Sequence, residues 1–348
     1  MSARHVVLVT YGEPPTPAFA DHLRYSWKIL RRLTRLVAPI PALAVPLIAL
    51  SRARFRNRLW RAEAYSSPLE AITCAQAAAL EHALAALEPG TLWKVHVAYE
   101  FRTPALEAVL AGIPTGEPTD VLPLYAADSA FTHGIARAVL EARGGNARVA
   151  LETRGGNARV VPALDPAVLA ELSSRHVFAG LARRGIVPGP EWALLLAAHG
   201  TLLTPPRPME TGRQATERIF VGMSHRLSPH FGRVQIGWLN HVFGGPWTAP
   251  AADRALAELA DAGFRKLVYY PFGFLADNAE TELEGRILYR AHPGLGVVHL
   301  PCLNASPDLA AALASAVTAP PDTTTQPDFP LRGEPSTPPE SVLPPVPA

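Results

Sequence analysis

Two apolar runs of this chain end in residues that can bind a cation or accept a proton. The run Trp192 to Ala198 is followed by His199 and Gly200, and the run Leu267 to Tyr270 leads into a segment that contains Glu280. In open α/β sheets, ligands bind at the carboxyl ends of the strands. We therefore expect an imidazole and a carboxylate to face one crevice from two strand ends.

The chemistry of these two side chains suits ferrous iron. A neutral imidazole can accept a proton or bind a metal ion, and a mixed imidazole and carboxylate site with open positions fits Fe(II). The chain has neither the CxxC nor the HExxH spacing that is typical of zinc sites. Glu284 follows Glu280 by four residues, so both acids share one face of a helix that begins near Asp277. This row of acids predicts a relay for cations or protons.

The overall charge argues against a general nucleic-acid binder. The chain has 348 residues with 32 Lys and Arg and 30 Asp and Glu, which leaves a formal net charge of +2. Its length is sufficient for two domains of ordinary size. Two cysteines, Cys74 and Cys302, provide no disulfide framework, and we interpret each as a small core residue.

One basic segment, residues 24–61, has several interpretations. It contains ten Lys and Arg residues, and no acid lies between Asp21 and Glu63. Its apolar run from Leu36 to Leu50 is interrupted by prolines and is shorter than the ~20 residues of a membrane-spanning helix. The segment forms either a solvated helical hairpin, the lip of a pocket for an amphipathic anion, or a surface that touches a membrane.

The N-terminus bears on the localisation of the protein. Because the apolar run Val6 to Val9 is too short for the core of a signal peptide, we expect a cytoplasmic protein.

The alternation of apolar runs with helical stretches is typical of parallel sheets with crossover helices. The expected strands are 6–11, 95–99, 121–125 and 149–161 in the first half, and 192–198, 234–238, 267–270 and 296–300 in the second. Residues 67–87 and 251–262 have helical spacing. The sequence therefore predicts an α/β fold with two similar Rossmann-like domains, each a small parallel sheet flanked by helices.

The expected boundaries follow from two local features. Residues 140–150 and 151–161 form a tandem repeat with Gly-Gly in each copy, which we interpret as one extra excursion at the surface. Residues 318–348 are rich in proline, and such a segment is expected to form a disordered tail. The N-terminal domain is thus expected to span 1–165 and the C-terminal domain 166–317.

Six segments, in order along the chain, resemble motifs of the ferrochelatase family, the enzymes that insert iron into porphyrins. They are residues 9–14 (VTYGEP), 66–69 (SSPL), 122–125 (LPLY), 197–200 (AAHG), Trp238 with 245–247 (GPW), and 271–281 (PFGFLADNAET). The resemblance covers about residues 5 to 315, and the ordered set makes it specific. It implies a chelatase-type version of the two-domain fold.

The resemblance also implies roles for His199 and Glu280. In that family the residues at these places face each other across the porphyrin cleft, where they bind the metal or accept the pyrrole protons. Two N–H protons must leave a free-base porphyrin as Fe(II) enters, so a base is needed beside the metal-binding group. The resemblance leaves open which of the two takes the protons. Fe(II) is then a substrate, and neither an organic cofactor nor an iron–sulfur cluster is expected.

Four residues are candidates for binding the porphyrin. Tyr11, at the end of the first strand, resembles the tyrosine of the coproporphyrin III branch and is expected to reach the iron. Arg58 and Ser67 are expected to bind propionates, for which arginine offers a bidentate fork. His133 follows the "PLY" strand, and it lies either in the pocket or on a helix surface.

The chain departs from the family pattern at three places. Residues 205–212 replace a G-D-P-Y sequence, residues 239–241 replace a Q-S segment, and Asn278 stands where a histidine is usual. The last change removes one proton acceptor next to Glu280.

The sequence therefore predicts a ferrochelatase, a lyase that forms metal–nitrogen bonds, in haem b synthesis. We expect coproporphyrin III as its porphyrin, with protoporphyrin IX next, and a monomer that contacts a membrane surface or a partner enzyme of the haem pathway. Two other functions stay open: a cobalt chelatase for a sirohydrochlorin-like ring, and a haem or porphyrin carrier without catalysis. A separation of more than ~12 Å between His199 and Glu280 would favour the carrier, because metal–ligand distances are near ~2 Å.

Overall fold

The computed structural model describes residues 3–36, 40–144, 158–205, 207–240 and 246–320. The centre of the tandem repeat (145–157) and most of the proline-rich tail (321–348) lie outside the described residues, and so do residues 37–39 of the apolar run. The expectations for these segments stay predictions. Met1–Thr318 is one compact unit, which holds all the helices and strands named below.

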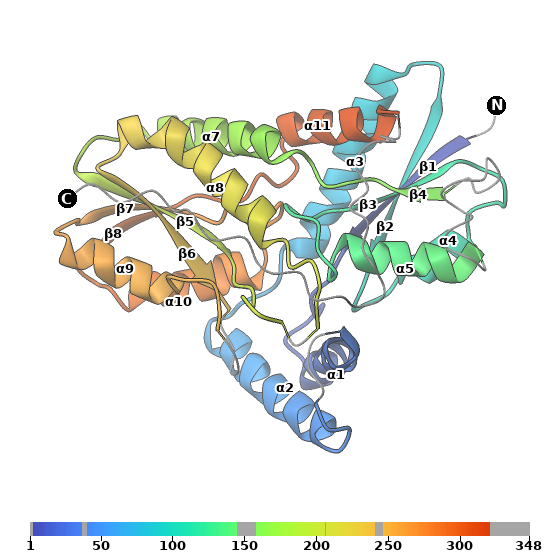
Figure 1. Cartoon of the computed structure of the whole chain (residues 1–348), viewed down its shortest axis with the longest axis horizontal. Helices are drawn as coiled ribbons and strands as arrows, with labels where there is room; N and C mark the ends of the chain where they lie inside the picture. The colour runs from blue at the N-terminus through green and yellow to red at the C-terminus, as the bar shows by residue number, and fades with distance from the viewer. Residues whose placement is uncertain (1–2, 37–39, 145–157, 206, 241–245, 321–348) are drawn as a thin grey trace. The chain divides into compact units, whose positions relative to one another are not determined.

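The first half of the chain forms a parallel sheet with the strand order β2-β1-β3-β4 (Figure 1). Its strands are β1 (Ala3–Thr10), β2 (Leu92–Tyr99), β3 (Thr119–Pro123) and β4 (Ala158–Val160). Apolar residues of β1 and β3 lie opposite each other, as Val7 does with Val121. The described part of β4 is shorter than the expected strand 149–161, most of which lies outside the described residues.

The second half forms a parallel sheet with the order β6-β5-β7-β8. Its strands are β5 (Trp192–His199), β6 (Arg233–Leu239), β7 (Lys266–Tyr270) and β8 (Gly296–His299). In each sheet the strand that comes first in the chain, β1 or β5, lies second in the spatial order of the strands. The two halves therefore share one topology. The prediction of two similar Rossmann-like units, each a parallel sheet flanked by helices, is confirmed.

Helices cover both sheets. They are α3 (Leu69–Leu87), α4 (Leu106–Ala111), α5 (His133–Gly144), α7 (Pro166–Ala182), α8 (Arg213–Leu227), the short η1 (Ser228–His230), α9 (Ala252–Asp261), the π-helix η2 (Ala279–Glu284), α10 (Gly285–Arg290) and α11 (Pro307–Thr318). On α3, Cys74 lies on the exposed face, because it falls outside the buried stripe that contains Thr73 and Ala77. The prediction of a core position was wrong for Cys74, whereas Cys302 is buried.

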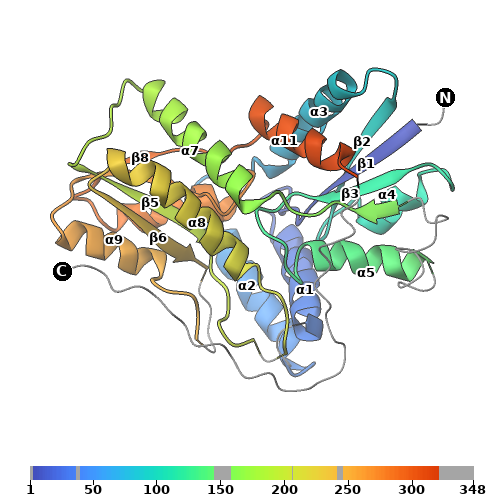
Figure 2. The same cartoon turned by 45° about the horizontal axis from the view of Figure 1, so that its top comes forward.

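The last helix, α11, returns to the first half and packs against α3, as Figures 1 and 2 show. As a result one apolar core runs through both sheets and includes Leu8 of β1, Leu80 of α3, Leu196 of β5 and Leu313 of α11. All four side chains are at most 3% exposed. Burial of such continuous apolar surface is the main stabilising term of a fold, so the two halves are fixed to each other by their shared core.

Two helices, α1 (Phe19–Leu36) and α2 (Ala44–Ala62), pack against each other as a hairpin below the sheets (Figure 1). The basic segment therefore forms a helical hairpin, and the pocket lip and the membrane surface stay predictions. Trp60, on the last turn of α2, is buried against Ala279 and Leu283 of η2. This contact holds α2 next to the helix that carries Glu280. Across the described ranges, no helix combines the length and apolarity needed to cross a membrane.

Candidate active site

The loop after β7 is pressed against the end of β5, where His199 lies. Gly273 donates a backbone hydrogen bond to the carbonyl oxygen of Ala197 at 3.2 Å. A β-carbon at Gly273 would lie 2.8 Å from the α-carbon of Ala198, so glycine is needed for this close approach. The two strand ends that carry the site are thus held in contact by their backbones.

Asn278 caps the helix that carries Glu280. Its side-chain oxygen accepts hydrogen bonds from the backbone N–H groups of Glu280 (2.8 Å) and Thr281 (3.3 Å), and the Thr281 hydroxyl accepts one from the Asn278 N–H (2.9 Å). This reciprocal arrangement is a capping box. The helix therefore begins at Ala279 rather than near Asp277, and its first turns are π rather than α. Asparagine thus provides a neutral cap at the place where the family usually has a histidine.

Asp277 has a structural role at the start of the same helix. Its carboxylate accepts hydrogen bonds from the Cys302 N–H at 2.7 Å and from the Asn304 side chain at 2.6 Å. These bonds tie the loop after β7 to the turn after β8, and they occupy both carboxylate oxygens. Of the acids in this stretch, Glu280 is the one that faces His199.

His199 and Glu280 form a direct pair. The Nδ1 atom of His199 lies 2.8 Å from Oε2 of Glu280, and the Asn240 amide donates a hydrogen bond to Oε1 of Glu280 at 3.1 Å. The His199 side chain is 49% exposed and the Glu280 side chain 18% exposed. The imidazole is therefore the more accessible member of a pair whose separation is far below the distance that would favour a carrier.

The two partners stabilise each other's charge. Burial lowers the pKa of His199, but the charge and hydrogen bond of Glu280, with a smaller contribution from Glu284, raise it above its ordinary value overall. Burial raises the pKa of Glu280, but His199, Arg56 and Asn240 lower it below its ordinary value overall. The two groups therefore favour each other's charged forms, and a metal ion that binds the imidazole has to displace any proton from the nitrogen it takes.

Two more carboxylates adjoin this pair, and with Glu280 they form what we call the carboxylate row: Glu13, Glu280 and Glu284. In a π-helix the four-residue spacing of Glu280 and Glu284 is just under one turn, so the two acids share a face as expected. Burial and the charge of Glu280 raise the pKa of Glu284 to about 7, against the opposing effect of Arg56. Glu284 is therefore suited to exchange a proton at neutral pH.

Glu13 and Arg56 were not predicted from the sequence. Glu13 is 3% exposed, and it accepts hydrogen bonds from the Ser67 hydroxyl at 2.5 Å and from the Ala279 N–H at 3.2 Å. Arg56 lies 3.8 Å from Glu13 and 3.9 Å from Glu284. A carboxylate two residues after Tyr11 was a usable signal for Glu13, whereas Arg56 is found only once α2 is placed.

The structure brings two of the porphyrin candidates near the pair. Tyr11 is half-buried directly after β1, and burial together with the charges of Glu13 and Glu280 raises its pKa well above the ordinary value. Its phenol is therefore neutral and lies within electrostatic reach of Glu280. The Ser67 hydroxyl is engaged by Glu13. Any contact between Ser67 and a propionate has to compete with that short bond.

The other two candidates lie elsewhere. Arg58 is exposed and lines a hollow of about 390 Å³ on α2 together with Leu47, Leu50, Ser51, Arg54 and Phe55. Arg56, two residues away on the helix, faces the acids instead, because residues two apart point to different sides. His133 is 0% exposed at the start of α5, so the placement on a helix surface was wrong. Its place in a porphyrin pocket stays a prediction.

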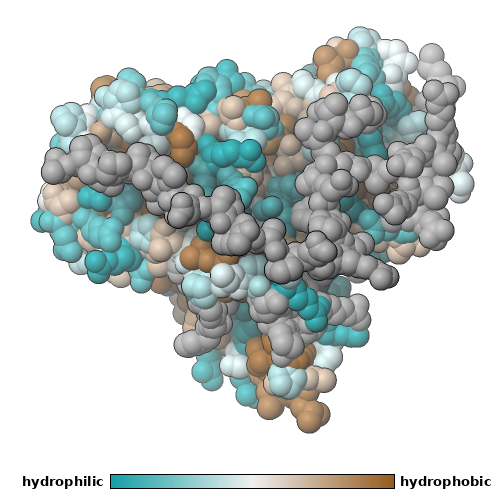
Figure 3. Space-filling model, in the orientation of Figure 1, coloured by the Kyte–Doolittle hydropathy of each residue, from teal (hydrophilic) through white to brown (hydrophobic). Residues whose placement is uncertain are grey.

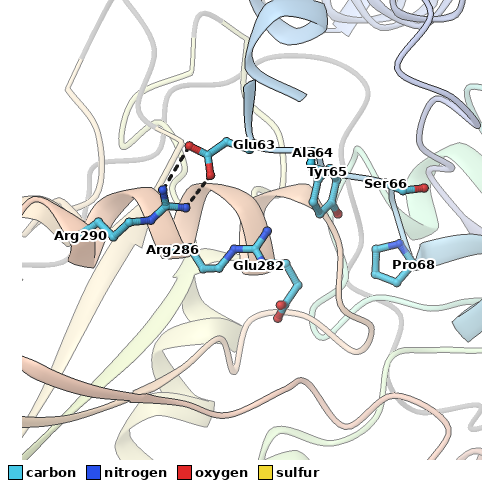
Figure 4. Close-up of a pocket in the computed structure, with 8 residues that line it drawn as sticks. All are labelled: Glu63, Ala64, Tyr65, Ser66, Pro68, Glu282, Arg286 and Arg290. Carbon is cyan, nitrogen blue, oxygen red and sulfur yellow. Dashed lines mark hydrogen bonds and ion pairs between the residues drawn. The ribbon is translucent and has the colours of Figure 1, made fainter. Parts of the chain in front are cut away.

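A hollow of about 580 Å³ lies beside the acid-bearing helix (Figure 4). It is lined by Glu63, Ala64, Tyr65, Ser66, Pro68, Glu282, Arg286 and Arg290. Arg290 binds both carboxylate oxygens of Glu63, at 3.2 and 2.5 Å. With two arginines and two glutamates the lining has no net charge, and neither His199 nor Glu280 contributes to it. The His199–Glu280 pair thus lies outside this hollow.

The His199–Glu280 pair suits a metal ion that is bound briefly and then transferred to a second ligand. Within the residues that the structure describes, no group of three or more His, Cys, Asp and Glu side chains is placed to hold a metal ion. His199 and Glu280 offer one imidazole nitrogen and a carboxylate, which leaves most coordination positions of a ferrous ion open. Open positions are needed where the nitrogens of a second ligand must take over the metal.

The chain is similar in sequence to known ferrochelatases. The family model described as Ferrochelatase matches residues 4–320. A ferrochelatase of Synechococcus sp. (strain JA-2-3B'a(2-13)) is 28% identical over 329 residues, which cover 91% of this chain and 92% of the relative. A coproporphyrin III ferrochelatase of Limosilactobacillus reuteri (strain DSM 20016) is 23% identical over 331 residues, which cover 89% of this chain and 96% of the relative.

A solved structure supports the fold. A multi-domain protein of Deinococcus radiodurans, described as structurally similar to chelatases, matches with a TM-score of 0.51 at 16% identity. The match covers 91% of this chain and 55% of that longer protein. Because the family model spans nearly all the described residues, the chain belongs to the ferrochelatase family, and it is an enzyme that inserts a metal ion into a porphyrin.

Proposed function

We propose that this enzyme inserts Fe(II) into coproporphyrin III during haem b synthesis, as a monomer in the cytoplasm and without an organic cofactor or an iron–sulfur cluster. The observation that supports the reaction most directly is the 2.8 Å contact between His199 and Glu280. It joins a proton acceptor and a metal-binding group at one accessible place, which is the minimum that metal insertion requires.

The division of labour follows from the ion pair. Two protons leave the porphyrin for each Fe(II) that enters. The iron porphyrin therefore carries the same net charge as the free-base porphyrin. Before iron arrives, the His199 ring holds a proton that Glu280 stabilises. When Fe(II) takes the Glu280 carboxylate, that stabilisation is lost, and His199 releases its proton to water. The neutral ring then accepts one pyrrole proton, passes it to water, and accepts the second in the same way. We propose that His199 takes the protons and Glu280 guides the iron.

The preference for coproporphyrin III is based on Tyr11 and on one relative. Tyr11 resembles the tyrosine of that branch and lies within electrostatic reach of Glu280. One relative is named a coproporphyrin III ferrochelatase, although others carry the broader name ferrochelatase. Four propionates need more cationic partners than two, and among the arginines of α2, Arg52 lies within electrostatic reach of Glu280.

The test is turnover of the purified full chain with coproporphyrin III and protoporphyrin IX in parallel, under anaerobic conditions with Fe(II). We expect iron insertion with both porphyrins and a kcat/KM at least ~10-fold higher for coproporphyrin III, about 1.4 kcal/mol of transition-state discrimination. A higher kcat/KM for protoporphyrin IX would overturn the substrate preference alone. Insertion of Co(II) but not Fe(II) into a sirohydrochlorin-like ring would replace the function by cobalt chelation. Porphyrin binding without insertion of either metal would identify a carrier.

The exposed side of α2 supports a peripheral membrane contact. Leu43, Leu47 and Phe55 are 89%, 69% and 67% exposed, and brown apolar surface gathers at the tip of the α1–α2 hairpin in Figure 3. Arg54 and Arg58 border the apolar residues. Apolar side chains ringed by cations suit a surface of anionic lipids.

We expect the protein to co-sediment with vesicles that contain phosphatidylglycerol. Leu47→Asp should weaken this binding, and equal sedimentation with neutral vesicles would contradict the electrostatic part.

A further inference from the structure

Arg56 reaches the carboxylate row from outside the two sheets. It lies on α2 four residues before Trp60, so both side chains point from the same face of the helix. Trp60 is 1% exposed and packs on Ala279 and Leu283 of η2. One turn earlier, the Arg56 guanidinium is therefore held over the residues that follow Glu280.

The guanidinium lies between two carboxylates without a hydrogen bond to either. It is 3.8 Å from Glu13 and 3.9 Å from Glu284, and both distances exceed hydrogen-bonding range. The rings of Tyr25 and Trp60 lie 5.7 and 5.9 Å from the same group. Arg56 is thus positioned by aromatic contacts and by helix placement, and it interacts with the acids through charge.

This position has two electrostatic consequences. The Arg56 side chain is 15% exposed and Glu13 is 3% exposed, so their charges are weakly screened by water. Arg56 lies 3.8 Å from Glu13 and 3.9 Å from Glu284, so its charge acts on both acids at short range. Its positive charge therefore already offsets part of the negative charge of the row when no metal ion is present. The same positive charge repels any cation that enters the row.

We propose that Arg56 is a tethered cation that competes with the incoming divalent metal for the carboxylate row and so keeps the site's metal affinity low. The inference rests on the proposed function, because it takes Glu280 of the carboxylate row as the group that receives the iron before insertion. A metal that must pass to the porphyrin cannot be bound too tightly by the protein. Because Arg56 belongs to α2 and not to either sheet, a movement of the α1–α2 hairpin would change this affinity.

The test is a calorimetric titration of the full chain with Zn²⁺, a divalent probe that does not oxidise, in the absence of porphyrin and at a pH above the raised pKa of Glu284. We expect Arg56→Gln to bind Zn²⁺ at least ~10-fold more tightly than the unaltered protein, which equals about 1.4 kcal/mol. Arg56→Lys keeps the charge and should stay within ~3-fold of the unaltered protein. Arg61→Gln removes a charge from an exposed position of the same helix and should also stay within ~3-fold.

Two further variants show whether the effect arises at this site. With Glu280→Gln as background, the gain from Arg56→Gln should disappear, as a double-mutant cycle requires for interacting groups. Glu13→Gln removes one of the two acids that lie next to Arg56, and we expect it to weaken Zn²⁺ binding. This variant also tests the proposal if Arg56→Gln does not fold. In turnover, Arg56→Gln should lower the KM for Fe(II) by a larger factor than it changes kcat.

The outcomes separate this proposal from the proposed function. Unchanged or weaker Zn²⁺ binding by folded Arg56→Gln would overturn the tethered cation, and so would an equal gain in Arg61→Gln. If the unaltered protein inserts iron and Arg56→Gln shows no gain, only this inference fails. If Arg56→Gln gains affinity but no form of the protein inserts iron, the function fails while the competition between Arg56 and the metal stands.

Discussion

Replacing His199 with alanine is expected to abolish iron insertion while porphyrin binding survives. The imidazole is the accessible half of the only His–carboxylate pair that we assign to the reaction, with Nδ1 at 2.8 Å from Glu280. Positioned acid–base groups typically contribute ~10²–10⁴-fold to rate, so we expect a loss of that size in kcat/KM. The measurement is anaerobic Fe(II) turnover, with porphyrin binding followed separately by fluorescence quenching.

A matched control keeps this result interpretable. His82→Ala removes an exposed histidine from α3, and turnover should stay near that of the unaltered protein. Near-normal turnover of His199→Ala would show that another group takes the pyrrole protons. Loss of porphyrin binding along with turnover would show instead that the imidazole holds the macrocycle.

Replacing Trp60 with alanine is expected to destabilise the protein by ~3–5 kcal/mol, the usual cost of removing a large buried aromatic side chain. Trp60 is 1% exposed, and its ring packs edge-on against His22 at 4.7 Å and Tyr65 at 4.8 Å. It also joins α2 to η2 through Ala279 and Leu283. Urea denaturation followed by circular dichroism would measure the change in the free energy of unfolding.

Leu47→Ala on the same helix is the control for Trp60→Ala. Its side chain is 69% exposed, so the free energy of unfolding should change by no more than ~0.5 kcal/mol. A loss below ~1 kcal/mol for Trp60→Ala would mean that the α1–α2 hairpin unfolds locally without the rest of the protein. The placement of Arg56 over the carboxylate row would then lack its main support.

Several parts of the fold could be predicted because they depend on local pattern. The apolar runs that become β1, β5 and β7 are buried on both faces, and such strands read as continuous hydrophobic segments. The ends of β5 and β7 then followed from the rule for open sheets, which placed His199 and Glu280 at one edge. Strand ends were accurate to a few residues.

The remaining parts depend on contacts between distant segments. Glu13 and Glu284 are 271 residues apart in the sequence, and Arg56 comes between them only because Trp60 seats α2 on η2. No spacing in the sequence encodes that arrangement. The burial of His133 and the exposure of Cys74 were missed for a related reason, since helix periodicity does not show which face the neighbouring elements cover. The π-helical first turns at Ala279 also have no signal in the local pattern.

Asn278 has a consequence for how the enzyme responds to acid. An amide carries no charge between pH 5 and pH 8, whereas a histidine in the same place would change its charge within that range. The hydrogen bonds from Glu280 and Thr281 to the Asn278 side chain therefore persist as pH falls. The cap that aims Glu280 therefore keeps its hydrogen bonds on acidification, whereas a histidine there would gain a positive charge beside Glu280.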